Sequence, residues 1–197
     1  RPYIGTKEGH FTRTSNRHDY ALAPFSKTAL DSLKDAGLDV IGVGKIPDIF
    51  VDQGITRKIK TVSNEDGMNK TIELASGNFN GLAFINLVDF DAVYGHRRNA
   101  AGYGKAIEEF DVQLGELINE LKNDDLLMVT ADHGNDPTYK GTDHTREQVP
   151  LVIYSKQFKD HKQLNEENTF GIIGATICDN FDVKYNGIGK SILSKLK

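Results

Sequence analysis

The chain has 197 residues, of which 26% are charged and 38% are apolar, and its formal net charge is −4. This length is that of one large domain, enough to bury about 70% of the unfolded surface in a single core. A weak net charge without blocks of like charge argues against a nucleic-acid partner. No apolar run reaches the ~20 residues of a membrane span and no signal-peptide pattern is present, so we expect a cytoplasmic protein.

The first 25 residues differ in character from the rest. The polar and basic run from Thr12 to His18 has no helical period and offers little to a core. We interpret it as a strand or loop that arrives from another part of the fold. Because the sequence begins with Arg1 instead of Met, we also expect the chain to be a piece of a longer protein.

From Ser26 onward, helix and strand patterns alternate. Ser26 and Asn64 are the predicted N-caps of the first two helices, and Gly37 is the predicted end of the first. In chain order we predict helix 26–36, strand 39–44, helix 64–76, strand 82–88, helix 100–122, strands 126–130 and 151–154, and helices 169–179 and 189–196.

Strands separated by helices predict an α/β fold with three layers, α/β/α, around a mainly parallel sheet. The apolar run 82–88 is typical of a central strand covered on both faces. In such a sheet, ligands bind beyond the carboxyl ends of the strands. Cys178 is the only cysteine, which excludes a disulfide framework and disfavours a thiolate zinc site.

Five candidate metal ligands follow two consecutive predicted strands, in segments predicted to be loops: Asp91, His96, Asp132, His133 and His144. Within a continuing strand, neighbouring side chains would point to opposite faces, so the use of Asp132 and His133 in one site requires that the chain turn at Gly134. Asp91 and His96 are five residues apart, which is not the i, i+4 spacing of a helical metal pair and predicts a loop that folds back on itself.

Each of these features has a plainer interpretation when taken alone. The tetrapeptide from Asp132 to Asn135 is equally consistent with a polar turn, and a lone His144 is more typical of a surface loop. The combination predicts a metal site. Carboxylates and imidazoles without thiolate favour Mn²⁺, Zn²⁺ or Fe²⁺. Five ligands are too many for one open catalytic ion and few for two, so we interpret the set as half of a two-metal phosphoryl-transfer centre.

The segments 86–99, 130–136 and 143–150 closely resemble the phosphopentomutases of the alkaline phosphatase superfamily, as do residues 11–21 and 44–50. The resemblance covers nearly the whole chain. The Asp132–His133 motif is common to the superfamily, whereas the segments that begin at Asp91 and at His144 are specific to this family.

The resemblance implies an alkaline phosphatase-like core and the interconversion of ribose 1-phosphate and ribose 5-phosphate, and of the deoxyribose pair, through a phosphothreonine and two Mn²⁺ ions. It assigns Asp132 and His133 to one ion, and Asp91, His96 and His144 to the other. The family's nucleophilic threonine and sixth metal ligand have no counterpart here. We therefore expect the chain to be the C-terminal part of such an enzyme and to be inactive by itself.

The resemblance also implies a division of the chain, with residues 1–22 as the end of an inserted cap domain with its return linker and residues 23–197 as the core. The partners would be small sugar phosphates, with neither nucleic acid nor membrane. Arg13 and Arg17 are candidates for gripping the substrate phosphate, since a guanidinium fork matches phosphate oxygens, although a solvated loop also explains them. Lys45 is a candidate for contacting the transferred phosphoryl group or, alternatively, a surface lysine.

Three further side chains near the candidate ligands are expected to support them. Arg97 and Arg98 flank His96 and could orient it. Asp89 is interpreted as a structural carboxylate instead of a ligand.

Other functions stay open at this point. Cofactor-independent phosphoglycerate mutases share the superfamily motifs but use a serine nucleophile and a different first ligand pair. A phosphatase or a nucleotide pyrophosphatase is more distant, and a non-catalytic metal-binding module is an alternative of a different class. The spacing of five between Asp91 and His96 favours the pentomutases.

Overall fold

The computed structural model describes residues 3–13 and 21–196 of the chain. The chain begins with a hairpin of two strands, and helices and strands alternate after it. They are β1 (Tyr3–Ile4), β2 (Thr12–Arg13), α1 (Ala29–Asp35), β3 (Asp39–Val43), α2 (Ile46–Ile49), β4 (Arg57–Ile59), α3 (Asn64–Ser76), β5 (Gly81–Ile85), the π-helical turn η1 (Phe90–Gly95), α4 (Ala100–Glu120), β6 (Leu127–Thr130), β7 (Leu151–Tyr154), α5 (Gly171–Asn180) and α6 (Leu193–Leu196).

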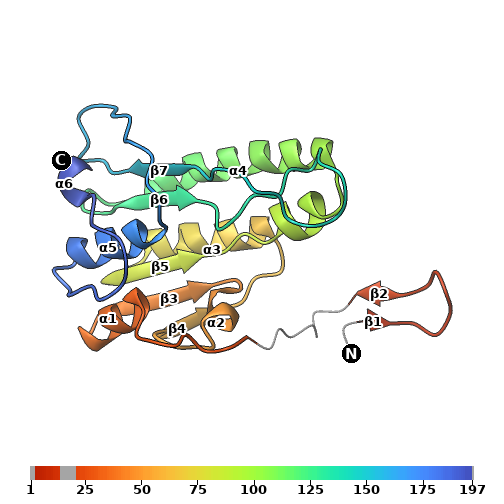
Figure 1. The fold of residues 1–197 in the computed structure, drawn as a ribbon, viewed down its shortest axis with the longest axis horizontal. Coiled ribbons are helices and arrows are strands. Elements are labelled where there is room, and N and C mark those ends of the chain that lie inside the picture. Colours follow the sequence, from red (N-terminus) through yellow and green to blue (C-terminus); the bar gives the residue numbers. More distant parts are fainter. Residues whose placement is uncertain (1–2, 14–20, 197) are drawn as a thin grey trace.

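The strands of the core form two groups. β3 lies between β4 and β5 and is parallel to both, whereas β6 and β7 pair with each other in antiparallel orientation. In Figure 1 the arrows of β3, β5 and β6 point the same way, so their carboxyl ends lie at one edge of the molecule. The segments that follow β5 and β6 therefore leave from the same edge.

β3 forms the centre of the core because its apolar side chains alternate between two helical layers. Val40 packs in a cluster with Leu30 and Leu33 of α1, while Ile41 and Val43 pack with Leu74 of α3. All six of these side chains are buried. An apolar strand that is covered on both faces is typical of parallel sheets.

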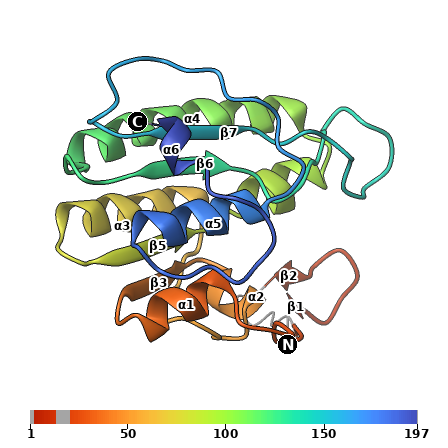
Figure 2. The same cartoon turned by 60° about the vertical axis from the view of Figure 1, so that its left-hand side comes forward.

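Helices cover both faces of the strands, which confirms the predicted α/β/α layering. α1 contacts β3 and α5, and α3 contacts β5 and α4. Figure 2 shows α1 and α5 on one side of the strands and α3 and α4 on the other. Among the helices in the described ranges, none is both long enough and apolar enough to cross a membrane.

Several predicted boundaries were wrong by a few residues. Thr28, not Ser26, caps α1, through a capping box with Asp31, and Ser63 caps α3 in place of Asn64. The strand predicted to end at residue 88 ends at Ile85, and the last helix begins at Leu193 instead of 189. The short elements α2 and β4 were not predicted, because four and three residues are too few to show a period.

The amino-terminal segment forms a two-stranded hairpin that lies apart from the core in Figure 1. Tyr3 pairs with Arg13 and Ile4 with Thr12. The strand expected in this segment is thus present in part.

Candidate metal centre

Asp91 lies in η1, a π-helical turn, and His96 directly follows it, whereas a loop was predicted for both. The backbone N–H of His96, the residue that ends this turn, donates to the carbonyl of Asp91 at 2.9 Å. In a π-helix this bond joins residues i and i+5, so residues five apart come onto the same side of the turn. The separation of five between the two residues therefore matches the hydrogen-bond spacing of this element.

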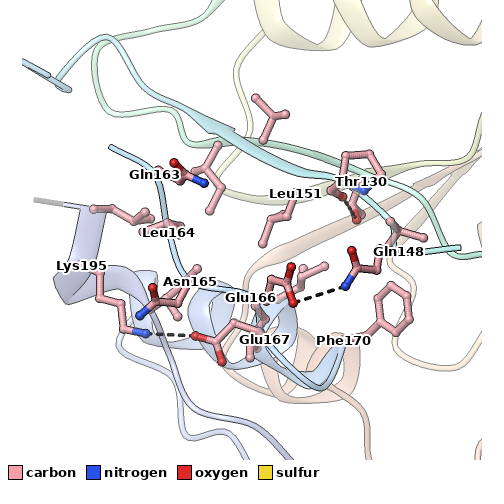
Figure 3. Close-up of a pocket in the computed structure, with 18 of the residues that line it drawn as sticks. Thr130, Gln148, Leu151, Gln163, Leu164, Asn165, Glu166, Glu167, Phe170 and Lys195 are labelled. Atoms are coloured by element: carbon pink, nitrogen blue, oxygen red, sulfur yellow. Dashed lines mark hydrogen bonds and ion pairs between the residues drawn. The ribbon is translucent and has the colours of Figure 1, made fainter. Parts of the chain in front are cut away.

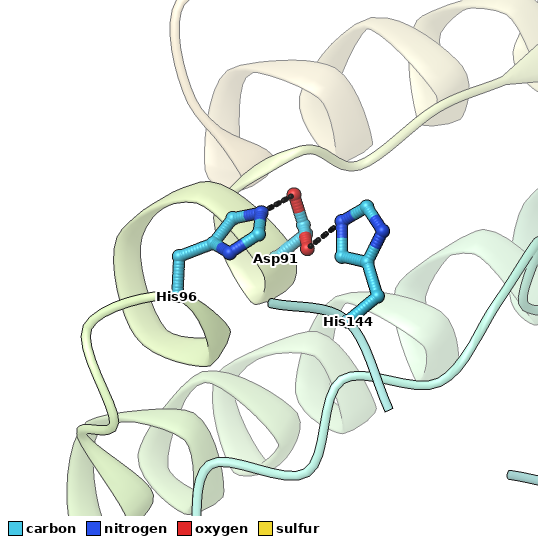
Figure 4. A group of neighbouring side chains, drawn as sticks. All are labelled: Asp91, His96 and His144. Atoms are coloured by element: carbon cyan, nitrogen blue, oxygen red, sulfur yellow. Dashed lines mark ion pairs between the residues drawn. The ribbon is translucent and has the colours of Figure 1, made fainter. Parts of the chain in front are cut away.

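Asp91, His96 and His144 form a compact cluster (Figure 4). The Asp91 carboxylate lies between the two rings, with Oδ2 at 3.3 Å from Nε2 of His96 and Oδ1 at 3.3 Å from Nε2 of His144. One ligand atom from each residue lies within 4.8 Å of the others. Two donors on one ion, with bonds of about 2.2 Å, are at most about 4.4 Å apart, so shifts of a few tenths of an ångström would let these three residues hold one divalent ion.

His133 and Asp132 extend this cluster on the side of β6. The ring of His133 stacks on that of His144 with centroids 3.9 Å apart, and its Nε2 lies 3.7 Å from Oδ1 of Asp132. β6 ends at Thr130, so Asp132 and His133 lie beyond the strand, as the sequence predicts. A chain of contacts thus brings all five predicted ligands together at the edge of the molecule where β5 and β6 end.

A loop between residues 134 and 145 places His144 in this cluster. Its ends meet in an isolated bridge, in which the N–H of Thr145 donates to the carbonyl of Gly134 at 3.1 Å. A Cβ on Gly134 would lie 2.7 Å from the Thr145 carbonyl oxygen and 2.5 Å from the Glu147 side chain. Glycine is therefore required at position 134 for this close approach.

Sequence reasoning missed one residue of the site, Asn135. Its side chain is buried, and its Nδ2 donates to Oδ1 of Asp91 at 2.6 Å. Of the two arginines expected to orient a ligand, Arg98 reaches Asn135, with Nη1 at 2.8 Å from Oδ1, while Arg97 is exposed. In the sequence, the only signal that Asn135 belongs to the site is its position two residues after the Asp132–His133 pair.

Asp89 has a structural role, in agreement with its interpretation from sequence. Its Oδ2 accepts from the backbone N–H of Asn64 at 2.7 Å, and its own N–H donates to Oδ1 of Asn64 at 2.9 Å. This pair joins the end of β5 to the start of α3. It anchors the segment from which η1 begins.

Two ionisable side chains near the cluster have shifted pKa values. Burial, and to a lesser extent the Asp91 carboxylate, raise the pKa of Tyr103 above its usual value. Hydrogen bonds from the side chain and backbone of Thr138 lower the pKa of Asp136. Tyr103 therefore stays neutral beside the cluster, and Asp136 stays ionised in the 134–145 loop.

The structure describes two of the three residues that were predicted to bind the substrate. Lys45 follows β3 and Gly44 at the carboxyl edge of the sheet and is half-buried. Arg13 lies in β2, where its backbone pairs with Tyr3. Arg17 lies outside the described residues.

An open pocket of about 1480 Å³ adjoins the cluster, with Asp132, His133 and His144 in its lining. It extends along β7 beneath the segment 156–170, part of which is drawn in Figure 3. Two polar contacts join its walls, Gln148 to Glu166 at 3.3 Å and Lys195 to Glu167 at 3.0 Å. Three of the five predicted ligands are thus open to molecules in solution.

Known proteins resemble this chain along its entire length. Over 198 residues it is 60% identical to a phosphopentomutase of Agathobacter rectalis and 57% identical to one of Clostridium botulinum. Both alignments cover 100% of this chain and 50% of the relative, so the chain spans about half the length of these relatives. The resemblance to phosphopentomutases is confirmed.

A solved structure supports the fold. The crystal structure of Leishmania mexicana phosphoglycerate mutase at low cobalt concentration matches with a TM-score of 0.63 at 17% identity, over 86% of this chain and 39% of that chain. At this identity the match shows a common fold and nothing about activity. Residues 3–185 match the Metalloenzyme superfamily, and because this span is most of the chain, the chain belongs to that superfamily.

Proposed function

We propose that this chain is the C-terminal part of a phosphopentomutase, which interconverts ribose 1-phosphate and ribose 5-phosphate and the corresponding deoxyribose phosphates. The observation that carries the proposal is the 57–60% identity to phosphopentomutases over the whole chain. The cluster of carboxylates and imidazoles beyond β5 and β6 supports it, since phosphoryl transfer requires charge stabilisation at such a site. We place the enzyme in the cytoplasm, with sugar phosphates as its partners.

In this proposal Asp91, His96 and His144 hold one Mn²⁺ ion, and Asp132 and His133 contribute to a second. Bound in this way, two ions would stabilise the attacking and leaving oxygens of the transferred phosphoryl group. The donor set suits Mn²⁺ because it mixes hard carboxylate oxygen with imidazole nitrogen. The threonine that carries the phosphoryl group and a sixth metal ligand would lie in the rest of the enzyme.

The remaining residues of this chain would bind and orient the substrate. Lys45, at the same edge of the sheet as Asp91, is proposed to contact the transferred phosphoryl group. Arg13 and Arg17 are proposed to grip the non-reacting phosphate, with residues 1–22 as the end of a cap domain and residues 23–197 as the core. A guanidinium can bind two phosphate oxygens at once, which would fix the sugar for transfer.

The activity is tested by assays of the full-length enzyme on ribose 1-phosphate and on 3-phosphoglycerate. We expect turnover of the ribose phosphate, loss of that turnover after exhaustive dialysis against EDTA, and the best recovery with Mn²⁺ compared with Mg²⁺ or Zn²⁺. Full activity in EDTA would contradict the metal requirement. Turnover of 3-phosphoglycerate alone would assign the chain to the phosphoglycerate mutases.

The separate roles of the arginines and the metal ligands are tested by steady-state kinetics. Arg13→Ala and Arg17→Ala should raise KM, whereas His133→Ala should mainly lower kcat and weaken metal retention. Lys7→Ala is the matched control, since Lys7 is an exposed cation in the turn of the same hairpin. Unchanged KM and kcat/KM in both arginine variants would remove the substrate role from residues 11–18 and leave the metal site standing.

A further inference from the structure

Arg98 occupies an unusual backbone position between η1 and α4. Its φ is 52°, in the left-handed region that residues other than glycine adopt infrequently. Its own N–H donates to the carbonyl of Gly95 at 3.1 Å, which closes the turn between the two helices. The side chain leaves this turn toward the 134–145 loop, more than 35 residues further along the sequence.

All the hydrogen bonds that the Arg98 guanidinium makes with described residues go to neutral acceptors, most of them in that loop. An arginine side chain carries five N–H donors in a planar fork. Here the fork donates to the side-chain amide oxygen Oδ1 of Asn135 at 2.8 Å. It also donates to four backbone carbonyls, those of Asp136 at 2.7 Å, of Gly95 at 3.2 Å and, at shorter distances, of Gly141 and Asp143. Because no carboxylate partner is among them, the contacts specify the shape of the loop.

Two of these contacts lead directly to the proposed metal ligands. Asn135, which accepts from Arg98, donates through Nδ2 to Oδ1 of Asp91 at 2.6 Å. Asn135 is buried, so its amide has no water to replace a lost partner. Asp143, whose carbonyl also accepts from Arg98, directly precedes His144.

The same loop sets the tautomer of His96. Nδ1 of His96 lies within hydrogen-bond distance of the carbonyl oxygen of Thr142, and a carbonyl can only accept, so Nδ1 carries the proton. In the neutral ring, the nitrogen that keeps the lone pair and could bind a metal ion is then Nε2, which faces Asp91. A backbone partner of this kind is the usual device for orienting a histidine that binds a metal ion.

We propose that Arg98 is a positioning residue for the metal centre, which holds Asp91, His96 and His144 in binding geometry through Asn135 and the carbonyls of the 134–145 loop. This inference rests on the proposed metal site. Lysine could not replace the arginine, because a single ammonium cannot donate to acceptors spread along both sides of a planar fork.

The experiment measures Mn²⁺ binding to the full-length enzyme, stripped of metal, by titration calorimetry and by the electron paramagnetic resonance of free Mn²⁺. The variants are Arg98→Met, Arg98→Lys and Asn135→Ala, with Arg97→Met as the matched control and His144→Ala as the variant that defines the site. Arg97 is exposed, and among the described residues it has no hydrogen-bond or ion-pair partner. Thermal unfolding of each metal-free protein monitors folding.

We expect both Arg98 variants to bind Mn²⁺ about 10- to 100-fold more weakly, with Asn135→Ala weakened in the same direction, while Arg97→Met binds as the unmodified enzyme does. Affinity equal to that of the unmodified enzyme in folded Arg98→Lys and Asn135→Ala would overturn the positioning role and leave the metal site intact. Equal losses in the Arg97 and Arg98 variants would overturn it in favour of a general charge effect. If His144→Ala bound Mn²⁺ normally, the proposed metal site itself would fail and the inference with it.

Discussion

The two groups of strands are held in place by different forces. Around β3, between α1 and α3, apolar side chains such as Leu33, Val40 and Val43 have no exposed surface at all. Between Leu117 and Ile172, which includes β6, β7 and the 134–145 loop, the described residues contain no buried apolar side chain. The chemistry of the candidate site therefore lies mostly in the half of the molecule that lacks a core.

Polar contacts take the place of packing in that half. Arg98 holds the 134–145 loop, and Lys156 donates to the carbonyls of Asn119 at 3.1 Å and of Leu121. Such bonds are directional, whereas apolar burial is not. A site that must hold ligand atoms to within a few tenths of an ångström gains more from directional contacts, at the expense of stability.

The largest expected effect is on stability in the β3 half. Leu33→Ala would leave a cavity beneath β3 and should reduce the free energy of unfolding by about 2–5 kcal/mol, measured by urea denaturation. Val152→Ala on β7 is the control, because 60% of that side chain is exposed and its loss should have little effect. Equal losses in the two variants would erase the distinction between the halves.

The second-largest expected effect is the stabilisation that metal binding gives to the half of the molecule that contains the loop. If Asp91, His96 and His144 bind Mn²⁺, the ion should stabilise the loop half selectively, with about 2.7 kcal/mol available at a concentration of 100 times Kd. Hydrogen exchange with and without Mn²⁺ measures this. Amides of residues 127–154 should become slower to exchange, while those of β3 stay as they were. A uniform change along the chain would show that the two halves respond as one unit.

The smallest effect is that of a surface ion pair in the β3 half. The Lys70 side chain, 2.7 Å away, and the N–H of Val62 lower the pKa of Asp66 below its usual 3.8. A carboxylate with a depressed pKa contributes stability at neutral pH that is lost as the pH falls through the folded-state value. Asp66→Asn should therefore be slightly less stable than the unmodified protein at neutral pH and equal to it in acid. Glu65→Gln, its exposed neighbour, is the control in the same urea titrations.

The pH dependence gives a second check on the same pair. If the difference between Asp66→Asn and the unmodified protein stayed constant from neutral pH to about pH 3, the ion pair would not be its source. The pair is partly exposed, so its contribution should stay well below that of Leu33.

The sequence by itself determined the elements that have a local signature. The apolar run in β3, the helical period of α4 and the polar residues that follow β5 and β6 are each visible within a short window. The chemical identity of the candidate ligands and the resemblance to phosphopentomutases follow from the same windows. Helix caps were predicted less well, because Ser, Thr and Asn close to a helix start all suit the role.

Only the tertiary structure decided how the candidate ligands meet. The spacing of Asp91 and His96 belongs to a π-helical turn, which has too few residues to show a period and was predicted as a loop. The choice of Arg98 over Arg97, and the part played by Asn135, depend on hydrogen bonds between residues 37 to 45 positions apart. Contacts at that separation leave no pattern in one sequence, because their partners are brought together by the packing of η1 and α4 beside the loop.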